Sequence, residues 1–417
     1  MSEPVFLLTP TVQQYDWGKL GLSSKVAQFA DAAHVAAIDD DAPYAELWMG
    51  THPSSPSTVA STSTPLAATL AQRPALLGPA VASQFDTASG SLPFLFKVLA
   101  IDKALSIQSH PDKPTAEKLH AAQPSIYKDP NHKPEMALAI TPFTALCGFR
   151  PLPEIAALLR ATPELAALVP AAATADLVRH PSKHALQAVF SAIATAPPSA
   201  FQPRLAALVA RYSSGDDVHP DEEAVKDLVL TLHAQFPGDV GIFCAFLLNH
   251  VRLSPGEAIF LGAGEPHAYL SGDIVECMAN SDNVIRVGLT PKLRDVPNLL
   301  ATLTYAAAPP AAHRVPPAPF PPSSPHTTLY DPPVPEFAVL HTSVPARASE
   351  AHRAIAGPSI ALVAQGAGRL LWQAPGDGGT GAVDVAEGSV VFVGADVAVD
   401  WAAGAGGLGV YRAFVEA

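Results

Sequence analysis

The chain has 417 residues and a net charge of −13, and 48% of its residues are hydrophobic, 15% charged and 7% aromatic. This apolar share excludes wholesale disorder, and the length predicts two or three domains. The acidic balance without a local basic patch argues against a nucleic-acid partner, and the lack of an uncharged apolar stretch of ~18 residues argues against a membrane partner.

The three cysteines, Cys147, Cys244 and Cys277, are far apart and form no C-x-x-C pair. This spacing excludes a thiolate zinc knuckle and a disulfide framework, and it suits a reducing compartment. The segment from Met1 to Pro10 is too short in apolar run for a signal peptide. We therefore expect a cytoplasmic protein, and the acidic surface without an obvious apolar stripe favours a monomer.

Short β-rich runs separated by turn residues occupy residues 1–150 and return over residues 240–305. The run from Leu92 to Leu99, for example, is apolar and has the length of a strand. We expect these two stretches to combine into one catalytic β domain of the sandwich or jelly-roll type.

Residues 151–239 have a helical texture instead. Their clearest amphipathic stripe follows an acidic first turn and consists of Val225, Leu228, Val229 and Leu232. The turn Pro237-Gly238-Asp239 closes the block. The pattern predicts an α-helical domain inserted between the two β-rich stretches.

Residues 306–335 are rich in proline, which predicts an extended or disordered connector. Residues 336–417 alternate apolar and polar side chains between glycines, as a second β-sandwich or jelly roll would. The G-x-G-x-x-G run at residues 404–409 is too close to the last residue to open a dinucleotide-binding helix, so we interpret it as a glycine-rich hairpin. The predicted fold is mainly β with a helical insertion.

The first chemistry-bearing stretch contains Gln108 and His110. If residues 106–110 form a strand, both side chains point to the same face, because side chains alternate with period two. Two adjacent groups able to bind a metal are a common beginning for a metal site in a β-barrel. The alternative is a surface histidine beside a turn-forming proline.

A second stretch places Lys133 and Glu135 two residues apart, with Pro134 disfavouring a helix between them. A solvated ion pair is the alternative for these two side chains. A third stretch has the spacing Gly256, Gly262, Gly264 and His267, which resembles the second cupin motif, with Gly262 where proline is usual. This pattern would deliver His267 into the mouth of a small barrel, although mere packing of the ring remains an alternative.

A fourth stretch carries Glu276 within an apolar run and Arg286 between Ile285 and Val287. If Glu276 faces inward, its carboxylate must pair with a cation or have a raised pKa. The alternative is that both side chains point outward from an alternating strand.

Taken together, two imidazoles, one carboxylate and one amide make a set of nitrogen and oxygen ligands that suits one Zn²⁺ with an open position. The single carboxylate leaves net positive charge at such a metal, which favours an anionic substrate and a developing oxyanion or enediolate. The proposed ligands are Gln108, His110, Glu135 and His267.

Six stretches in order resemble those of the type I mannose-6-phosphate isomerases (phosphomannose isomerases), zinc enzymes of the cupin superfamily. They are residues 15–19 (YDWGK), 46–53 (ELWMGTHP), 108–113 (QSHPDK), 129–135 (DPNHKPE), 264–269 (GEPHAY) and 281–292 (SDNVIRVGLTPK). The resemblance covers residues 10 to about 305 and implies that both β regions are cupin-like. It implies the same four zinc ligands, with Arg286 as the catalytic arginine.

The resemblance further implies interconversion of mannose 6-phosphate and fructose 6-phosphate through an enediol, feeding GDP-mannose formation and glycosylation. A base must then reach the C2 proton, and Glu276 is the candidate, with Lys133 and His52 as alternatives. Residues expected to bind the phosphorylated sugar are Ser109, Lys97, Lys292 and Tyr269.

Two other functions would also fit parts of the pattern. A cupin Fe(II) dioxygenase uses two histidines and a carboxylate, but it would have no use for the lysines and the arginine near the site. A sugar-sensing protein could keep the cupin shell, but it would be expected to lose the base or Arg286.

Overall fold

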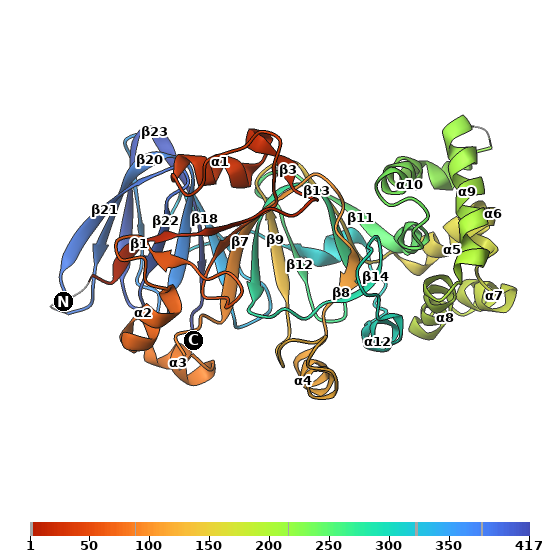
Figure 1. Ribbon diagram of the computed structural model, residues 1–417, viewed down its shortest axis with the longest axis horizontal. Coiled ribbons are helices and arrows are strands. Elements are labelled where there is room, and N and C mark those ends of the chain that lie inside the picture. Colours follow the sequence, from red (N-terminus) through yellow and green to blue (C-terminus); the bar gives the residue numbers. More distant parts are fainter. Residues whose placement is uncertain (1–2, 88, 216, 322–323, 377) are drawn as a thin grey trace.

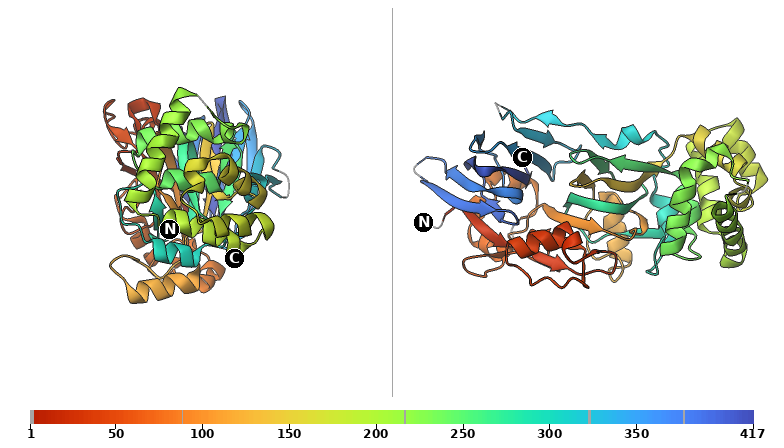
Figure 2. Two further views of the ribbon diagram at one scale, coloured as in Figure 1. Left: turned by 90° about the vertical axis from the view of Figure 1, so that its right-hand side faces the viewer. Right: turned by 90° about the horizontal axis from the view of Figure 1, so that it is seen from above.

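The computed structural model describes residues 3–87, 89–215, 217–321, 324–376 and 378–417. Three blocks follow one another along its longest axis (Figure 1): a sheet that contains the C-terminal strands, a central sheet, and a group of helices at the far end. Figure 2 shows the same row from above. The predicted fold class, mainly β with a helical insertion, is confirmed.

The central sheet has eleven strands and depends on one long strand, β13 (His267–Ala279). Residues 272–279 of β13 pair with β7 (Phe94–Ile101) and β9 (Glu135–Ala139), whereas its first residues pair with β10 (Phe143–Phe149). Both β-rich stretches of the sequence therefore share one sheet. The other strands are β2 (Thr11–Gln13), β5 (Glu46–Met49), β8 (Ile107–Ser109), β11 (Leu248–Leu253), β12 (Ala258–Leu261), β14 (Ile285–Gly288) and β15 (Arg314–Val315).

β13 changes partners at Gly272, which explains why a glycine stands there. Its φ is +111°, a backbone conformation that side chains disfavour. A Cβ at this position would also lie 2.5 Å from the carbonyl oxygen of Pro142. The bend at Gly272 lets one strand line two walls of the same barrel.

The second large sheet has ten strands and unites the two ends of the chain. β1 (Val5–Thr9) pairs with β22 (Val390–Val393), and the Phe6 ring stacks on Phe392 with 5.0 Å between centroids. This pairing differs from the expectation that residues 1–150 belong wholly to the catalytic β domain. The other strands are β6 (Thr58–Val59), β16 (Ala318–Pro319), β17 (Thr327–Tyr330), β18 (Ala338–Val344), β19 (Ser349–His352), β20 (Ser359–Gln373), β21 (Thr380–Ala386) and β23 (Ala398–Phe414).

Two proline- and glycine-rich segments prove to be parts of these sheets. The segment 306–335 runs along both of them, because β15 pairs with β12 and β17 pairs with β18. The glycine run at 404–409 lies inside β23 and not at a hairpin. The register between β20 and β23 shifts where β20 pairs with this part of the chain, as it does at a β-bulge. The remaining small sheet joins β3 (Lys19–Leu20) and β4 (Pro43–Tyr44).

The helical block bears out its amphipathic pattern, since all four stripe residues predicted in α10 are buried. Arg211 further ties the block together by pairing with Glu164 at 2.8 Å and with buried Glu222 at 2.7 Å. The helices of this block are α5 (Leu152–Ala161), α6 (Pro163–Ala166), α7 (Ala171–Arg179), α8 (Lys183–Ala194), α9 (Pro198–Ser214), η3 (Pro220–Glu222) and α10 (Glu223–Gln235).

Shorter helices cover the sheets, and within the described ranges no helix has the length and apolar character needed to cross a bilayer. They are η1 (Gly21–Ser23), α1 (Lys25–Ala32), α2 (Leu66–Gln72), η2 (Pro74–Leu76), α3 (Pro79–Gln84), α4 (Lys113–Ala122), α11 (Gly241–Cys244), η4 (Ala245–Leu247), α12 (Val296–Thr302) and η5 (Pro310–His313).

Phe149 joins the helical block to the central sheet. Its side chain is 0% exposed at the end of β10. Its ring stacks on Tyr305 with 5.5 Å between centroids and meets Phe190 of α8 edge-on at 5.2 Å. One hydrophobic core therefore continues from the barrel into the helices.

We predict that Phe149→Ala lowers the free energy of unfolding by about 3–5 kcal/mol, because it empties a fully buried aromatic position. Chemical denaturation followed by circular dichroism would measure the change. Phe149→Leu keeps most of the volume and should cost less. Equal stability of the wild type and the alanine variant would contradict this view of the junction.

Candidate active site

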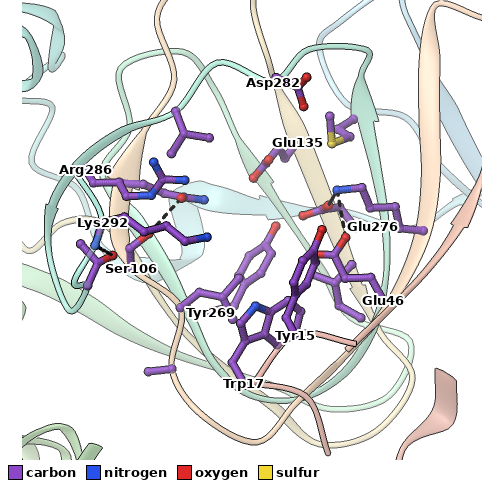
Figure 3. A pocket seen from close by; sticks show the side chains of 18 of the residues that line it. Tyr15, Trp17, Glu46, Ser106, Glu135, Tyr269, Glu276, Asp282, Arg286 and Lys292 are labelled. Carbon is purple, nitrogen blue, oxygen red and sulfur yellow. Dashed lines mark hydrogen bonds and ion pairs between the residues drawn. The ribbon is translucent and has the colours of Figure 1, made fainter. Parts of the chain in front are cut away.

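A cavity of about 360 Å³ opens in the central sheet, within the size range of small-molecule sites. Strands of the sheet and the loops that join them supply its lining, and Phe236 of the helical block adds to it. Figure 3 shows Arg286, Lys292 and Ser106 gathered on one side, Glu276 and Glu46 on the other, and Tyr269 between them.

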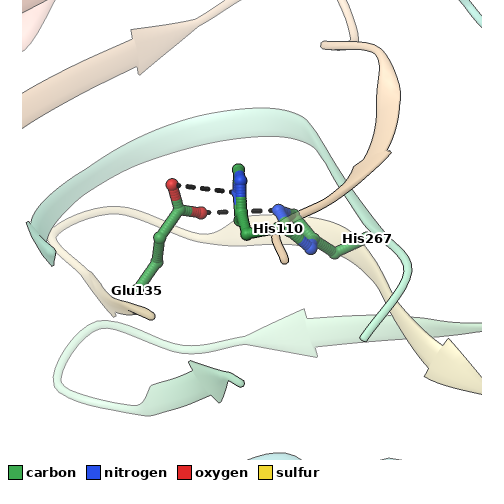
Figure 4. A group of neighbouring side chains, drawn as sticks. All are labelled: His110, Glu135 and His267. Atoms are coloured by element: carbon green, nitrogen blue, oxygen red, sulfur yellow. Dashed lines mark ion pairs between the residues drawn. The ribbon is translucent and has the colours of Figure 1, made fainter. Parts of the chain in front are cut away.

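Three side chains that can bind a metal meet beside this cavity, and of the three Glu135 is part of its lining. His110, Glu135 and His267 are all buried, and their ligating atoms lie within 4.8 Å of one another. The Nε2 atom of His110 lies 3.3 Å from one carboxylate oxygen of Glu135, and that of His267 lies 3.4 Å from the other (Figure 4).

Backbone carbonyl groups orient both imidazole rings. The Nδ1 of His110 bonds to the carbonyl oxygen of Asn283 at 2.7 Å, and the Nδ1 of His267 bonds to that of Glu265 at 2.9 Å. Each ring therefore donates through Nδ1 and turns the lone pair of Nε2 towards Glu135. This outer arrangement is the one that fixes histidine as a metal ligand.

The atoms that face one another have no hydrogen-bond partner. Both Nε2 atoms and the Oε2 of Glu135 are buried without one. Buried polar atoms are ordinarily paired, so their convergence at one point fits a cation that the group would hold. In this respect the residues present suit a divalent metal.

The protonation of the group fits the same use. Burial lowers the pKa of His110 to about 4, which keeps its imidazole neutral. Burial opposes ionisation of Glu135, but the Lys133 ammonium, 3.1 Å away, helps to hold the pKa of that carboxyl well below its ordinary value. Neutral imidazole and ionised carboxylate are the forms that bind a metal.

Gln108, the fourth predicted ligand, lies beside this group. It is directly opposite His267 where β8 pairs with β13, and it lines the cavity. Its Oε1 accepts a hydrogen bond from the Oγ of Ser106 at 3.2 Å. The structure thus groups three of the predicted ligands, from β9, β13 and the residue after β8, and places Gln108 on the strand beside His267.

A second charged group lies on the opposite side of the cavity. The Nζ of Lys97 is 3.3 Å from Glu276 and 3.5 Å from Glu46, and it lies 4.7 Å from the centroid of the Trp48 ring. Burial disfavours the charge on Lys97, but the two carboxylates raise its pKa above the ordinary value. Burial, with a contribution from Glu135, raises the pKa of Glu276.

The predicted sugar-binding residues divide into two groups. Tyr269, Lys292 and Lys97 line the cavity. The ammonium group of Lys97 already forms ion pairs with two carboxylates, Glu46 and Glu276. Ser109 is fully buried and is not part of the cavity lining, because it points from β8 away from the face that Gln108 shares.

Several lining residues were missed by the sequence interpretation. Ser106 reaches the cavity in place of Ser109, and Glu46 and Trp48 surround Lys97. Asp282 lies 3.3 Å from the Nε2 of His52. Apart from Ser106, they fall within the family-like stretches, which was the signal that could have identified them.

A buried group of two histidines and one carboxylate beside a charged cavity in a β-barrel defines a metal-dependent enzyme of the cupin type. The chain belongs to the type I phosphomannose isomerase family. It matches the catalytic domain of phosphomannose isomerase type I over residues 5–152 and the helical insertion domain over residues 165–248.

Full-length relatives agree with this assignment. The chain is 45% identical to mannose-6-phosphate isomerase of Cryptococcus neoformans var. neoformans and 44% identical to that of Saccharomyces cerevisiae, with 100% of each chain covered. A solved mannose 6-phosphate isomerase of Salmonella typhimurium, bound to fructose 6-phosphate and zinc, shares 31% identity with a TM-score of 0.82, covering 100% of both chains.

We predict that His267→Ala abolishes tight binding of a divalent metal. Loss of a ligand should weaken binding by more than the roughly 10- to 100-fold that loss of an outer partner costs. Elemental mass spectrometry after dialysis would measure metal per chain. His184→Ala, on the exposed face of α8, is the matched control and should keep its metal, whereas equal metal in both variants would contradict the assignment.

Proposed function

We propose that the chain interconverts mannose 6-phosphate and fructose 6-phosphate through an enediol, with one bound Zn²⁺. The convergence of three unpartnered, buried ligating atoms, with Glu135 reaching the lining of a cavity that also has cationic side chains, carries this proposal. The names of the full-length relatives, and the fructose 6-phosphate and zinc in the Salmonella structure, support the same substrates and metal.

Gln108, His110, Glu135 and His267 would hold the Zn²⁺. When bound, the ion would polarise the oxygens of the open-chain sugar. The chain supplies the remaining requirements of the reaction: an anchor for the phosphate, a base for the proton, and a fixed cation for the charge that develops.

The phosphate would bind on the side of the cavity that contains Lys292 and Ser106. Both line the cavity, and in Figure 3 they lie beside Arg286 and across from the carboxylates. Lys292 replaces Lys97, and Ser106 replaces Ser109, as the anchors we favour. A phosphate held there would position the sugar for reaction, since orientation by a remote group lowers the barrier at the reacting carbons.

Arg286 would stabilise the negative charge of the enediolate. It lies directly opposite Gln108 where β14 pairs with β8. The backbone of Arg286 is therefore next to one of the proposed metal ligands. Burial lowers the pKa of Arg286 from its ordinary value. An arginine still keeps its proton there, and a preorganised cation in a low-dielectric site stabilises developing charge strongly.

Glu276 would move the proton between C2 and C1. It lines the cavity, and its raised pKa suits a group that both accepts and returns a proton. All three candidates have a partner, since Lys133 pairs with Glu135, His52 with Asp282 and Glu276 with Lys97, so the raised pKa is what favours Glu276. Tyr269 lines the cavity between the two charged sides, and its hydroxyl would bind a sugar oxygen.

We further propose a cytoplasmic monomer that feeds mannose activation to GDP-mannose and glycosylation. The three cysteines are free and buried, which supports a reducing compartment.

The defining experiment measures fructose 6-phosphate formation from mannose 6-phosphate before and after chelation. We expect turnover that a strong chelator abolishes and Zn²⁺ restores. Turnover that survives prolonged chelation would remove the metal from the proposal. No turnover by zinc-loaded protein would overturn the isomerase function, and oxygen consumption with Fe²⁺ would then be measured.

We predict that Glu276→Gln lowers kcat by about 100- to 10,000-fold, the usual contribution of a general base. In the wild type, kcat/KM should fall as acid protonates Glu276, at a pH above its ordinary pKa of 4.5 because the folded pKa is raised. Stopped kinetic assays across pH would measure both effects. The exposed Glu117→Gln of α4 is the control, and near-normal turnover of Glu276→Gln would remove it as the base.

A further inference from the structure

A short loop, residues 289–292, follows β14 and forms part of the cavity rim. Leu289, Thr290, Pro291 and Lys292 all line the cavity. Leu289 is 1% exposed and has a φ of +53°, a left-handed conformation that a leucine rarely adopts. Such a residue keeps this conformation only where its surroundings impose it.

Asp239 of the helical block makes the contacts that impose it. Its Oδ1 accepts hydrogen bonds from the backbone N–H of Leu289 at 2.8 Å and of Gly241 at 2.7 Å. Its Oδ2 accepts from the N–H of Thr290 at 3.3 Å. Asp239 ends the Pro237-Gly238-Asp239 turn that closes the helical block, so one carboxylate ties the exit of that block to the rim loop.

Two glycines allow this approach. A Cβ on Gly288 would lie 2.5 Å from the Cα of Gly241, and a Cβ on Gly241 would lie 2.7 Å from the nitrogen of Leu289. Either atom would also come within 2.9 Å of Oδ1 of Asp239. The two backbones are therefore in direct contact, and the space around the carboxylate accepts no side chain at either position.

The chain beyond the rim loop is fixed as well. Asp295 caps α12 by accepting from the N–H of Asn298 at 3.2 Å, and it accepts from the hydroxyl of Tyr127 at 2.7 Å. Lys292 is thus an exposed residue on a segment that is fixed at both ends. Asp239 fixes the end that follows β14, and Asp295 fixes the end that precedes α12.

We infer that Asp239 is a positioning residue for substrate: through its hydrogen bonds to Leu289 and Thr290 it fixes the rim loop that carries Lys292. This inference rests on the proposed function, and it gives the helical insertion a part in recognising the phosphate. Asp239 is not among the residues that line the cavity, so it acts on substrate through the loop.

The test compares full-length, zinc-loaded Asp239→Ala and Asp239→Asn with the wild type. For Asp239→Ala we expect KM for mannose 6-phosphate to rise about 10-fold, the inhibition constant of inorganic phosphate to rise in parallel, and kcat to change less than about 3-fold. Asp239→Asn keeps one acceptor oxygen but turns an NH₂ group towards the backbone N–H of Thr290, where it cannot accept a hydrogen bond. KM and the inhibition constant of phosphate should therefore each rise about 3-fold. Asp227→Asn, exposed on α10, is the matched control and should behave as the wild type.

A merely structural role would lower thermal stability or kcat while leaving KM and phosphate inhibition within about twofold of the wild type, and that result would overturn the inference. If Asp239→Ala does not fold, the same two constants of Asp239→Asn decide. If the wild type does not isomerise mannose 6-phosphate, the proposed function fails separately. Calorimetric binding of inorganic phosphate to wild type and variant then decides on Asp239, with weaker binding supporting its role and equal binding overturning it.

Discussion

Glu135 puts a negative charge where almost no water reaches, and the central sheet is arranged around that charge. A buried carboxylate stays ionised only with positive charge or ligated metal close by. Here Lys133 lies in the same segment, and two histidines approach from β8 and β13. Lys133 supplies that charge, and the Nε2 atoms of the two histidines complete a group at which three strands, distant in sequence, converge beside the cavity.

The second large sheet shows what a buried polar cluster looks like when it serves packing alone. There the Nε2 of His352 contacts the hydroxyls of Thr327 and Thr342, and its Nδ1 lies 3.4 Å from buried Arg412. Arg412 in turn donates to Ser359 at 2.8 Å. Both ring nitrogens of His352 have hydrogen-bond partners. In His110 and in His267, the Nε2 atom has none. Similar β architecture thus carries a reactive centre in one sheet and a satisfied core in the other.

Local patterns predicted the site where a short stretch determines geometry. Strand periodicity predicted that Gln108 and His110 share a face, and glycine spacing predicted that His267 enters the barrel, but the family resemblance was needed to join these stretches into one ligand set. Ser109 shows the limit, because one residue of strand register decides whether a side chain faces the cavity. Lys97 shows another, since its partners Glu46 and Glu276 come from β5 and β13 and no local pattern records them. The place of β1 in the far sheet was equally unreadable, because its partner is almost the whole chain away.

That pairing of β1 with β22 has a consequence for how the protein is made. Val5 is synthesised long before its partner Val393, so the sheet cannot be completed until the chain has grown past β22. Contacts between such distant residues slow folding, and until they form, the apolar edge of β1 that pairs with β22 is open to other chains. The central barrel has its last strand pairing, β15 with β12, some way before Val393. Closure of the ten-stranded sheet therefore waits until β22 has been synthesised, and until then an edge of β1 stays open to aggregation.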